Sequence, residues 1–384
     1  MLTHDALKRD VERRIKRIQV MMVENDLGAL IVIGHAAPGG IGALRYISNA
    51  HLWGGAGYAV LGVNDAHPWV QIWSSYQAVW TRNETTTLPE RVESPSDLVG
   101  RTAELAKSVA GGNGRIGMVN MNKLLSVGMY KQFAAALEGC EIVEVTDAFN
   151  AVRQIKTPFE LEAIQQNGAI LDEAMDVFKH YAHVGARYWD VCAAVEGFIK
   201  GHGAFWGRTK LSLDLTPYTV PTAKDLRMKE EDIINFEIVY ESPWGYWLEM
   251  TTVFSFLELP EEVRAMLDGY LMAVENSSAA AKAGNTFRDV SEANDNTLRE
   301  LGFPVDGKHT PDCHSTGLDG SDGPSTASDP DFVLKPNMVL SFHPGTVLEN
   351  DRGFLISDNF LVTPEGGVRL SPHNAHRYYI RLDA

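Results

Sequence analysis

The sequence predicts a two-domain protein of the α+β class, in which an α/β first half precedes a second half of long helices and a β-hairpin. The chain has 384 residues, more than one hydrophobic core usually supports. Strand-like and helical runs alternate over roughly the first 150 residues, whereas the second half places β-rich runs between long helical patterns. We expect domains at residues 1–154 and 155–384.

In the first half, apolar periodicity predicts each element in chain order. An amphipathic helix covers residues 4–26, and a buried strand covers Leu27–Gly34. The Gly-rich loop that follows lacks both the Lys-Ser/Thr ending and the spacing of a nucleotide-binding loop. The other patterns indicate a largely parallel or mixed sheet, with strands at 57–63, 69–73, 115–119 and 141–145 and helices at 98–109 and 123–137.

The second half begins with a helix that starts at residues 157–158 and runs to about Tyr181. Proline suits a first helical turn, and Glu160 and Glu162 suit the positive helix end. Two β-rich runs flank the turn Ser-Pro-Trp-Gly at 242–245, which predicts a hairpin. We further expect helices at 190–202, 260–283 and 286–301, and strands at 211–219, 232–240, 247–257, 338–342 and 354–363.

Composition excludes several classes of function. The net charge of −16 disfavours binding to nucleic acid or to an anionic membrane. No apolar run approaches the roughly 20 residues that span a bilayer, and the N-terminus lacks a signal-peptide core. The three cysteines are few and odd in number, which argues against a disulfide framework. We therefore expect a cytoplasmic protein.

Several polar residues stand in apolar surroundings in the second half. Glu237 and Glu249 lie inside the two hairpin arms, where a carboxylate needs a cation, a hydrogen-bond donor or a catalytic role. Alternatively, Glu237 and Glu249 both point outward from a sheet that has one solvent-exposed face. His314 lies in a Gly-rich segment, and His343 follows a strand. Each of these alone is more often structural, so their common order along the chain is the stronger signal.

Five segments resemble, in chain order, motifs of the catalytic domain shared by methionine aminopeptidase, prolidase, aminopeptidase P and creatinase, the pita-bread fold. They are Arg153-x-x-Lys156-x-x-x-Glu160-x-x-x-Ile164, Gly284-Asn-Thr-Phe-Arg-Asp-Val, His314-Ser-Thr-Gly317-Leu-Asp, Asn337-Met-Val-Leu-Ser-Phe-x-Pro344-Gly345 and Ile356-Ser-Asp-Asn-Phe-Leu-Val-Thr. The resemblance implies a pita-bread catalytic domain preceded by a creatinase-type α/β N-terminal domain.

The chain departs from the two-metal site that two Asp, one His and two Glu form in these peptidases. His314 matches the His, and Glu249 takes the position of one Asp, while the other Asp falls beside Glu237. His343 and Ser357 stand at the two Glu positions. Because these changes remove ligands of the second metal, the resemblance predicts a broken two-metal site.

Three alternatives follow for the remaining site. Glu249, His314 and His343 suit one Zn, Fe or Mn ion with open positions, with Glu237 or Asp358 as a further ligand or supporting group. As in creatinase, the same residues, with Glu237, could instead handle protons without a metal. The third alternative is a catalytically inactive site.

The resemblance implies an enzyme that acts on a small polar non-peptide substrate, by C–N bond hydrolysis or by lyase-type elimination. The alternatives are a two-metal Xaa-Pro peptidase and an inactive ligand-binding homologue. A cationic or aromatic substrate would be bound by four further residues, Tyr218, Tyr246, Trp53 and Asp358. A homodimer is also implied, in which the neighbour's N-terminal domain helps to build each site.

Overall fold

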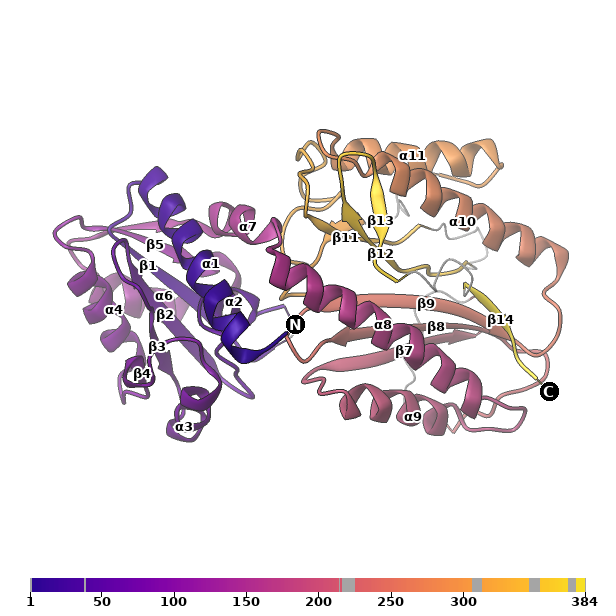
Figure 1. The fold of residues 1–384 in the computed structure, drawn as a ribbon, viewed down its shortest axis with the longest axis horizontal. Coiled ribbons are helices and arrows are strands. Elements are labelled where there is room, and N and C mark those ends of the chain that lie inside the picture. The colour runs from indigo at the N-terminus through magenta and orange to yellow at the C-terminus, as the bar shows by residue number, and fades with distance from the viewer. Residues whose placement is uncertain are drawn as a thin grey trace. The chain divides into compact units, whose positions relative to one another are not determined.

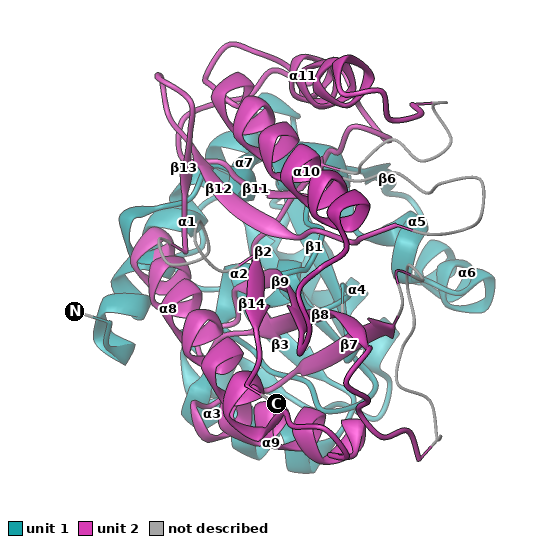
Figure 2. Ribbon diagram, turned by 90° about the vertical axis from the view of Figure 1, so that its right-hand side faces the viewer, with its two compact units in different colours: residues 1–159, 318–323 teal, residues 160–317, 324–384 magenta. Residues whose placement is uncertain are grey.

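The computed structural model describes residues 2–37, 39–213, 215, 225–305, 313–344, 353–371 and 378–383. Two compact units make up the chain (Figure 2). Unit 1 contains Met1–Phe159 and Leu318–Gly323, and unit 2 contains Glu160–Gly317 and Pro324–Ala384. Among the described residues, no helix is both long and apolar enough to cross a membrane.

Unit 1 is built on a mixed six-stranded sheet of order β4-β3-β2-β1-β5-β6, as the alternation of elements predicts. Strand β1 pairs antiparallel with β2 and parallel with β5. A hydrophobic core of unit 1 lies between this sheet and two helices, α4 and α6. The strands are β1 (Ala29–His35), β2 (Ala56–Gly62), β3 (Trp69–Ile72), β4 (Val92–Glu93), β5 (Arg115–Val119) and β6 (Glu141–Glu144).

The helices of unit 1 depart from the prediction in two ways. The helix expected over 123–137 is divided, because Leu125 is extended and the Ser126 hydroxyl accepts the Met129 N–H to begin a new helix. Helices α2, α3 and α7 were not expected. The full set is α1 (His4–Glu24), α2 (Gly42–Ser48), α3 (Ser75–Glu84), a 3-10 turn (Pro89–Arg91), α4 (Leu98–Val109), α5 (Met121–Leu124), α6 (Val127–Ala136) and α7 (Thr146–Gln154).

Unit 2 contains two four-stranded sheets, of orders β14-β9-β8-β7 and β10-β11-β12-β13, among its described residues. Helices α8 and α9 cover the first sheet, and α10 and α11 lie against the second (Figure 1). The elements are α8 (Pro158–Tyr181), α9 (Tyr188–Gly201), β7 (Gly207–Leu213), β8 (Ile233–Glu241), β9 (Trp247–Ser255), α10 (Glu261–Ala280), α11 (Phe287–Glu300), β10 (Cys313–Ser315), β11 (Val339–Phe342), β12 (Asp358–Val362), β13 (Gly367–Arg369) and β14 (Tyr379–Arg381).

The predicted hairpin is confirmed as β8 and β9, which pair antiparallel over their whole length. Gly245 in the turn has a φ of 91°, a conformation that favours glycine. The strand before the hairpin begins earlier than predicted, at Gly207 rather than at residue 211. Position 214 and positions 216–219 of that prediction lie outside the described residues.

Candidate active site

The register of strands β7, β8 and β9 places three charged side chains on one face of their sheet. Lys210 lies opposite Glu237, which lies opposite Thr251, and Glu249 lies opposite Val239. Opposite residues share a face, as do alternate residues along a strand. Lys210, Glu237 and Glu249 therefore share this face.

The other face of the sheet is apolar and holds the strands in place. Phe236 of β8 and Phe254 of β9 pack on Phe178 of α8, with ring centroids 4.2 and 4.4 Å apart. Phe236 and Phe254 are fully buried. This alternation of apolar and charged residues is the period-two pattern of a strand that has one face in the core.

Strand β9 is the element that brings distant segments to Glu249. The Trp247 N–H donates to the carbonyl of Gly317 at 2.7 Å, close after His314. The Thr251 N–H donates to the carbonyl of Ser357 at 3.2 Å. In addition, the side-chain amide of Asn359 donates to the Glu249 carbonyl. Backbone contacts on both sides of Glu249 thus anchor the segments that carry the other candidate residues.

Glu249, His314 and His343 form a compact cluster. Oε1 of Glu249 lies 3.2 Å from Nε2 of His314 and 3.1 Å from Nε2 of His343. The two Nε2 atoms are 3.1 Å apart, and the rings stack with centroids 5.1 Å apart. All three side chains are largely buried, with exposures of 11–14%. The structure therefore unites the three residues that were predicted as ligands or proton carriers.

The hydrogen-bond partner of Nδ1 in each of His314 and His343 determines which imidazole nitrogen carries the proton. Nδ1 of His314 lies 3.2 Å from the carbonyl of Ser315, which only accepts, so this Nδ1 donates. Nδ1 of His343 lies 3.1 Å from the hydroxyl of Ser357, whose own proton goes to Oε1 of Glu237 at 2.6 Å. In the neutral form, both imidazoles therefore direct the lone pair of Nε2 toward Glu249.

The carboxylate of Glu249 is also held in its accepting form. Burial by itself would raise its pKa, but a protonated, charged His343 and the hydrogen bonds that protonated imidazoles donate hold the pKa of Glu249 well below its ordinary value. When both imidazoles are neutral, by contrast, three acceptor atoms converge on one point. Such an arrangement needs a positive centre, which is either one added proton on an imidazole or one cation.

The donor set fits a single divalent cation. One ligand atom from each residue lies within 4.8 Å of the others. Tetrahedral zinc, with bonds of about 2.0–2.1 Å to nitrogen and oxygen, separates its ligand atoms by about 3.3 Å, close to the spacings of 3.1–3.2 Å in the cluster. Two imidazoles and one carboxylate would leave an open position for water or substrate.

Glu237 lies on the far side of His343 and is already neutralised. Its carboxylate forms an ion pair with Lys210 and accepts the hydroxyl proton of Ser357. Both Glu237 and Ser357 are buried. Lys210 was not among the predicted site residues, because the strand was expected to begin at residue 211. The alternation of Arg208, Lys210 and Ser212 with Thr209 and Leu211 was the signal that could have identified it.

Two other predicted site residues, Asp358 and Tyr246, lie outside the Glu249 cluster. Asp358 is buried and receives hydrogen bonds from Nε of Arg369, at 2.7 Å, and from the hydroxyl of Tyr378. Burial raises the pKa of Asp358 despite these partners. The Tyr246 hydroxyl is buried and donates to Oε1 of Glu160 at 3.2 Å. These contacts assign Asp358 and Tyr246 structural partners.

The remaining two predicted substrate contacts cannot be placed at the cluster. Tyr218 lies outside the described residues. Trp53 belongs to unit 1 and is 62% exposed. Since Glu237 and Asp358 are paired with cations, the expectation of a cationic substrate now rests mainly on Glu249.

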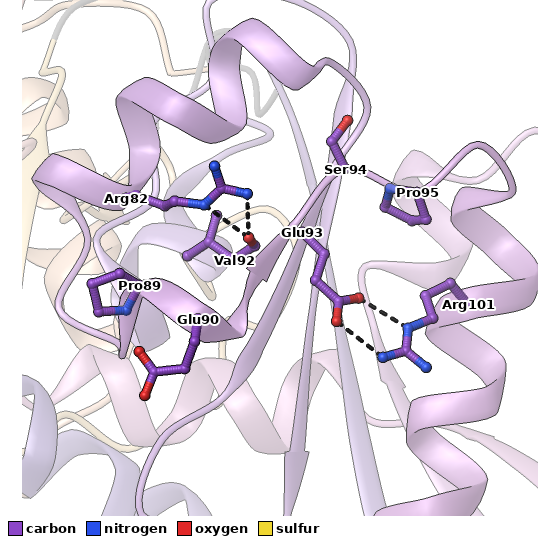
Figure 3. A pocket seen from close by; sticks show the side chains of 8 residues that line it. All are labelled: Arg82, Pro89, Glu90, Val92, Glu93, Ser94, Pro95 and Arg101. Atoms are coloured by element: carbon purple, nitrogen blue, oxygen red, sulfur yellow. Dashed lines mark hydrogen bonds and ion pairs between the residues drawn. The ribbon is translucent and has the colours of Figure 1, made fainter.

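Two hollows in the described residues differ in their relation to the cluster. A cavity of about 10 Å³, room for about one water molecule, lies between His343, Cys313 and Asn294. A far larger hollow of about 820 Å³ lies on unit 1 (Figure 3). Three of its four charged side chains already have protein partners, since Arg101 binds Glu93 and Arg82 donates to the Val92 carbonyl. We therefore place the candidate site at the Glu249 cluster.

Comparison with known proteins assigns a family to each half of the chain. The model of metallopeptidase family M24 matches residues 162–364. The model of the creatinase/prolidase N-terminal domain matches residues 14–155.

An uncharacterized hydrolase/peptidase of Sinorhizobium fredii is 27% identical over 250 residues, which cover 63% of this chain and 63% of that protein. An uncharacterized peptidase of Staphylococcus saprophyticus is 24% identical over 239 residues, 59% of this chain and 65% of that protein. Each match thus spans less than two thirds of the relative's length.

Solved structures confirm the predicted fold. The X-Pro aminopeptidase from Thermotoga maritima has a TM-score of 0.80 at 19% identity, covering 95% of this chain and 99% of its own. The Xaa-Pro dipeptidase from Bacillus anthracis has a TM-score of 0.79 at 18% identity, covering 96% of this chain and 100% of its own. The pita-bread domain behind a creatinase-type N-terminal domain is therefore confirmed.

Proposed function

Because the chain belongs to metallopeptidase family M24, a family of hydrolases in the creatinase/prolidase superfamily, we propose that it hydrolyses a C–N bond of a small non-peptide substrate at Glu249, His314 and His343, with a single divalent cation. The observation that carries the proposal is the convergence of three acceptor atoms at 3.1–3.2 Å. The adjoining position supports one cation rather than two, because Ser357 and the Lys210–Glu237 ion pair occupy it.

Glu249 has one oxygen for each of two roles. Oε1 faces both imidazoles, whereas Oε2 makes no hydrogen bond that involves the described residues. In the proposed reaction, a water molecule gives a proton to Oε2 while its oxygen bonds to the substrate carbon. Oε2 then returns this proton to the leaving nitrogen as the C–N bond breaks. A divalent cation held by the three residues would act as a Lewis acid and make that water more acidic.

The two imidazoles hold the reacting groups in position. Each Nδ1 is fixed by its own acceptor, so each Nε2 keeps a defined direction toward Glu249. The low exposure of the cluster limits competing water and strengthens the electrostatic interactions within it. These features support a role in catalysis over a purely structural one.

Metal content and substrate class test the proposal together. Protein purified without chelators is expected to contain about one divalent ion per chain. Elemental mass spectrometry measures this metal content. His314→Ala and His343→Ala should each lower zinc affinity by more than tenfold, whereas the exposed His180→Ala should not change it. Amine release is then assayed from guanidino acids, cyclic amidines and N-acyl amines. Turnover of none of these by metal-loaded protein contradicts the proposal.

A second candidate function, an Xaa-Pro peptidase, is favoured by the names of the solved structures with the same fold. It requires efficient cleavage of Xaa-Pro dipeptides and about two metal ions per chain. The same two measurements therefore separate the candidates. Peptide cleavage with two bound ions would replace our proposal, while turnover of a non-peptide substrate with one bound ion would support it.

A further inference from the structure

A continuous series of polar contacts leads from the edge strand β7 to the imidazole of His343. The ammonium group of Lys210 pairs with the carboxylate of Glu237. Oε1 of Glu237 accepts the proton of the Ser357 hydroxyl at 2.6 Å. The oxygen of Ser357 in turn lies 3.1 Å from Nδ1 of His343. Glu237 is 2% exposed and Ser357 is fully buried, so the hydrogen bond between them is shielded from water, while the Lys210 side chain is 23% exposed at the outer end of the series.

We propose that Lys210 is a positioning residue that acts through Glu237 and Ser357 to keep the proton of neutral His343 on Nδ1 and its Nε2 directed at Glu249. The functional consequence of this series rests on the proposed function of the cluster. The protonation pattern itself rests only on the contacts, which makes the two separable by experiment.

The direction of each hydrogen bond follows from the one before it. An ammonium group only donates, and an ionised carboxylate only accepts. Glu237, paired with Lys210, therefore accepts from Ser357. With its only proton committed to Glu237, the Ser357 oxygen is left to accept from Nδ1 of His343. Reversing the series would require Glu237 to donate a proton to Ser357, although its carboxylate already accepts from Ser357 and pairs with the ammonium of Lys210.

The same strand offers a matched control. Arg208 lies two residues before Lys210 on the same face of the sheet, opposite Val239. It is exposed, and it makes no hydrogen bond or ion pair in the described part of the chain. Arg208→Met therefore removes a positive charge from the same face without touching the series of contacts.

The first test reads the tautomer of His343 directly. Nitrogen-15 NMR of histidine-labelled, metal-free protein is recorded above the ordinary imidazole pKa of about 6.5, with His343→Gln used to assign the signals. We expect Nδ1–H in the wild type and in Arg208→Met. Lys210→Met and Ser357→Ala should shift His343 toward Nε2–H or a mixture, and Lys210→Arg should restore the wild-type pattern. Circular dichroism checks that each variant is folded.

Two results would overturn the inference. One is an Nε2–H tautomer in the wild type. The other is an unchanged tautomer in both Lys210→Met and Ser357→Ala while these variants remain folded, because a purely structural ion pair would leave His343 unaffected.

The second test uses the sign of a change in zinc affinity. Coulomb attraction alone predicts that loss of the Lys210 charge tightens the binding of a cation. The proposed series predicts the opposite, because His343 loses its fixed orientation. We expect Lys210→Met to weaken zinc binding about 10–100-fold, as loss of a supporting hydrogen bond commonly does, at unchanged stoichiometry. The proposed role of Lys210 would be contradicted if Lys210→Met bound zinc more tightly, bound it with unchanged affinity, or bound a second zinc ion.

Failure of the proposed function would look different from failure of this inference. If the wild type neither binds zinc nor hydrolyses any substrate in the panel, the proposed function fails, yet the NMR experiment still reports the tautomer of His343. If zinc binding and turnover are found but the tautomer does not depend on Lys210, only the inference fails.

Discussion

Nε2 of His343 lies 3.1 Å from Oε1 of Glu249. The contact joins the end of β11 to the middle of β9, two strands that belong to different sheets of unit 2. It is the closest link between a predicted acid and a predicted imidazole, and Glu249 is the residue on which most of the proposed chemistry depends.

Replacing Glu249 by glutamine should abolish most of the activity while leaving the fold intact. Glutamine keeps the size of the side chain but cannot take up a proton at Oε2. We expect kcat/KM to fall by about 10²–10⁴-fold, the usual contribution of a general acid or base. Glu258→Gln is the control, because Glu258 is exposed and pairs only with Arg381 among the described residues. Equal activity of the two variants would exclude Glu249 as the proton carrier.

Gly42→Ala should destabilise the protein. A Cβ at Gly42 would lie 2.3 Å from Oδ2 of Asp319 and 2.8 Å from Nη1 of Arg153, two residues that form a buried ion pair. The expected loss is about 1–3 kcal/mol of unfolding free energy, as for other overpacked sites. It is measured by urea denaturation.

The control for this substitution lies in helix α9. Gly197→Ala adds a methyl group where no heavy atom lies within 4 Å. Since alanine favours a helix interior over glycine by about 0.5–1 kcal/mol, this variant should be slightly more stable than the wild type. A loss of stability at Gly197 equal to that at Gly42 would show that steric crowding around Asp319 is not the cause.

The start of helix α11 should show a defined dependence on pH. Thr286 and Asp289 form a reciprocal capping box, and hydrogen bonds from Thr286 lower the pKa of Asp289 below its ordinary value of 3.8. A lowered pKa stabilises the fold above that ordinary value, and the stabilisation is lost as pH falls through the folded-state pKa. Asp289→Ala should therefore cost about 0.5–1 kcal/mol near neutral pH.

The difference between wild type and Asp289→Ala should begin to shrink as the pH falls below the ordinary aspartate pKa of 3.8, and it should disappear below the lowered folded-state pKa. Thermal unfolding over a pH series measures it. Glu292→Ala, an exposed position on the same helix, serves as the control and should show little change at any pH. A constant difference for Asp289→Ala across the series would rule out an effect of the ionised cap.

The homodimer and the role of Trp53 stay predictions. Trp53, Trp73 and Tyr76 expose large apolar surfaces on unit 1, at 62, 51 and 83%, and such patches are common at protein interfaces. We expect light scattering to give the mass of a dimer.

Trp53→Ala should raise KM if this residue contacts substrate in a neighbouring site. Trp189→Ala, at a less exposed position of unit 2, is the comparison, and an effect of equal size would argue against a specific role for Trp53.

Local signals in the sequence were enough to predict much of the fold. The turn at Gly245 and the apolar alternation around it were enough to predict the hairpin that carries Glu237 and Glu249. Prolines marked the start of α8 and the residue before α10. The prediction was weaker where helices lack clear periodicity, as in α3, or where a serine cap divides a helical pattern at Ser126.

Which polar groups meet depends on long-range packing, which local sequence patterns do not reveal. Strand periodicity assigns Glu237 and Asp358 to faces, but it does not reveal that Lys210 neutralises one and Arg369 the other. Those partners lie on neighbouring strands, and the contacts of the site depend on strand register and on how two sheets join at β9. The same long-range contacts place Nδ1 of His343 on Ser357. Local pattern therefore predicts the side chains available to the site, while long-range packing sets their charge and direction.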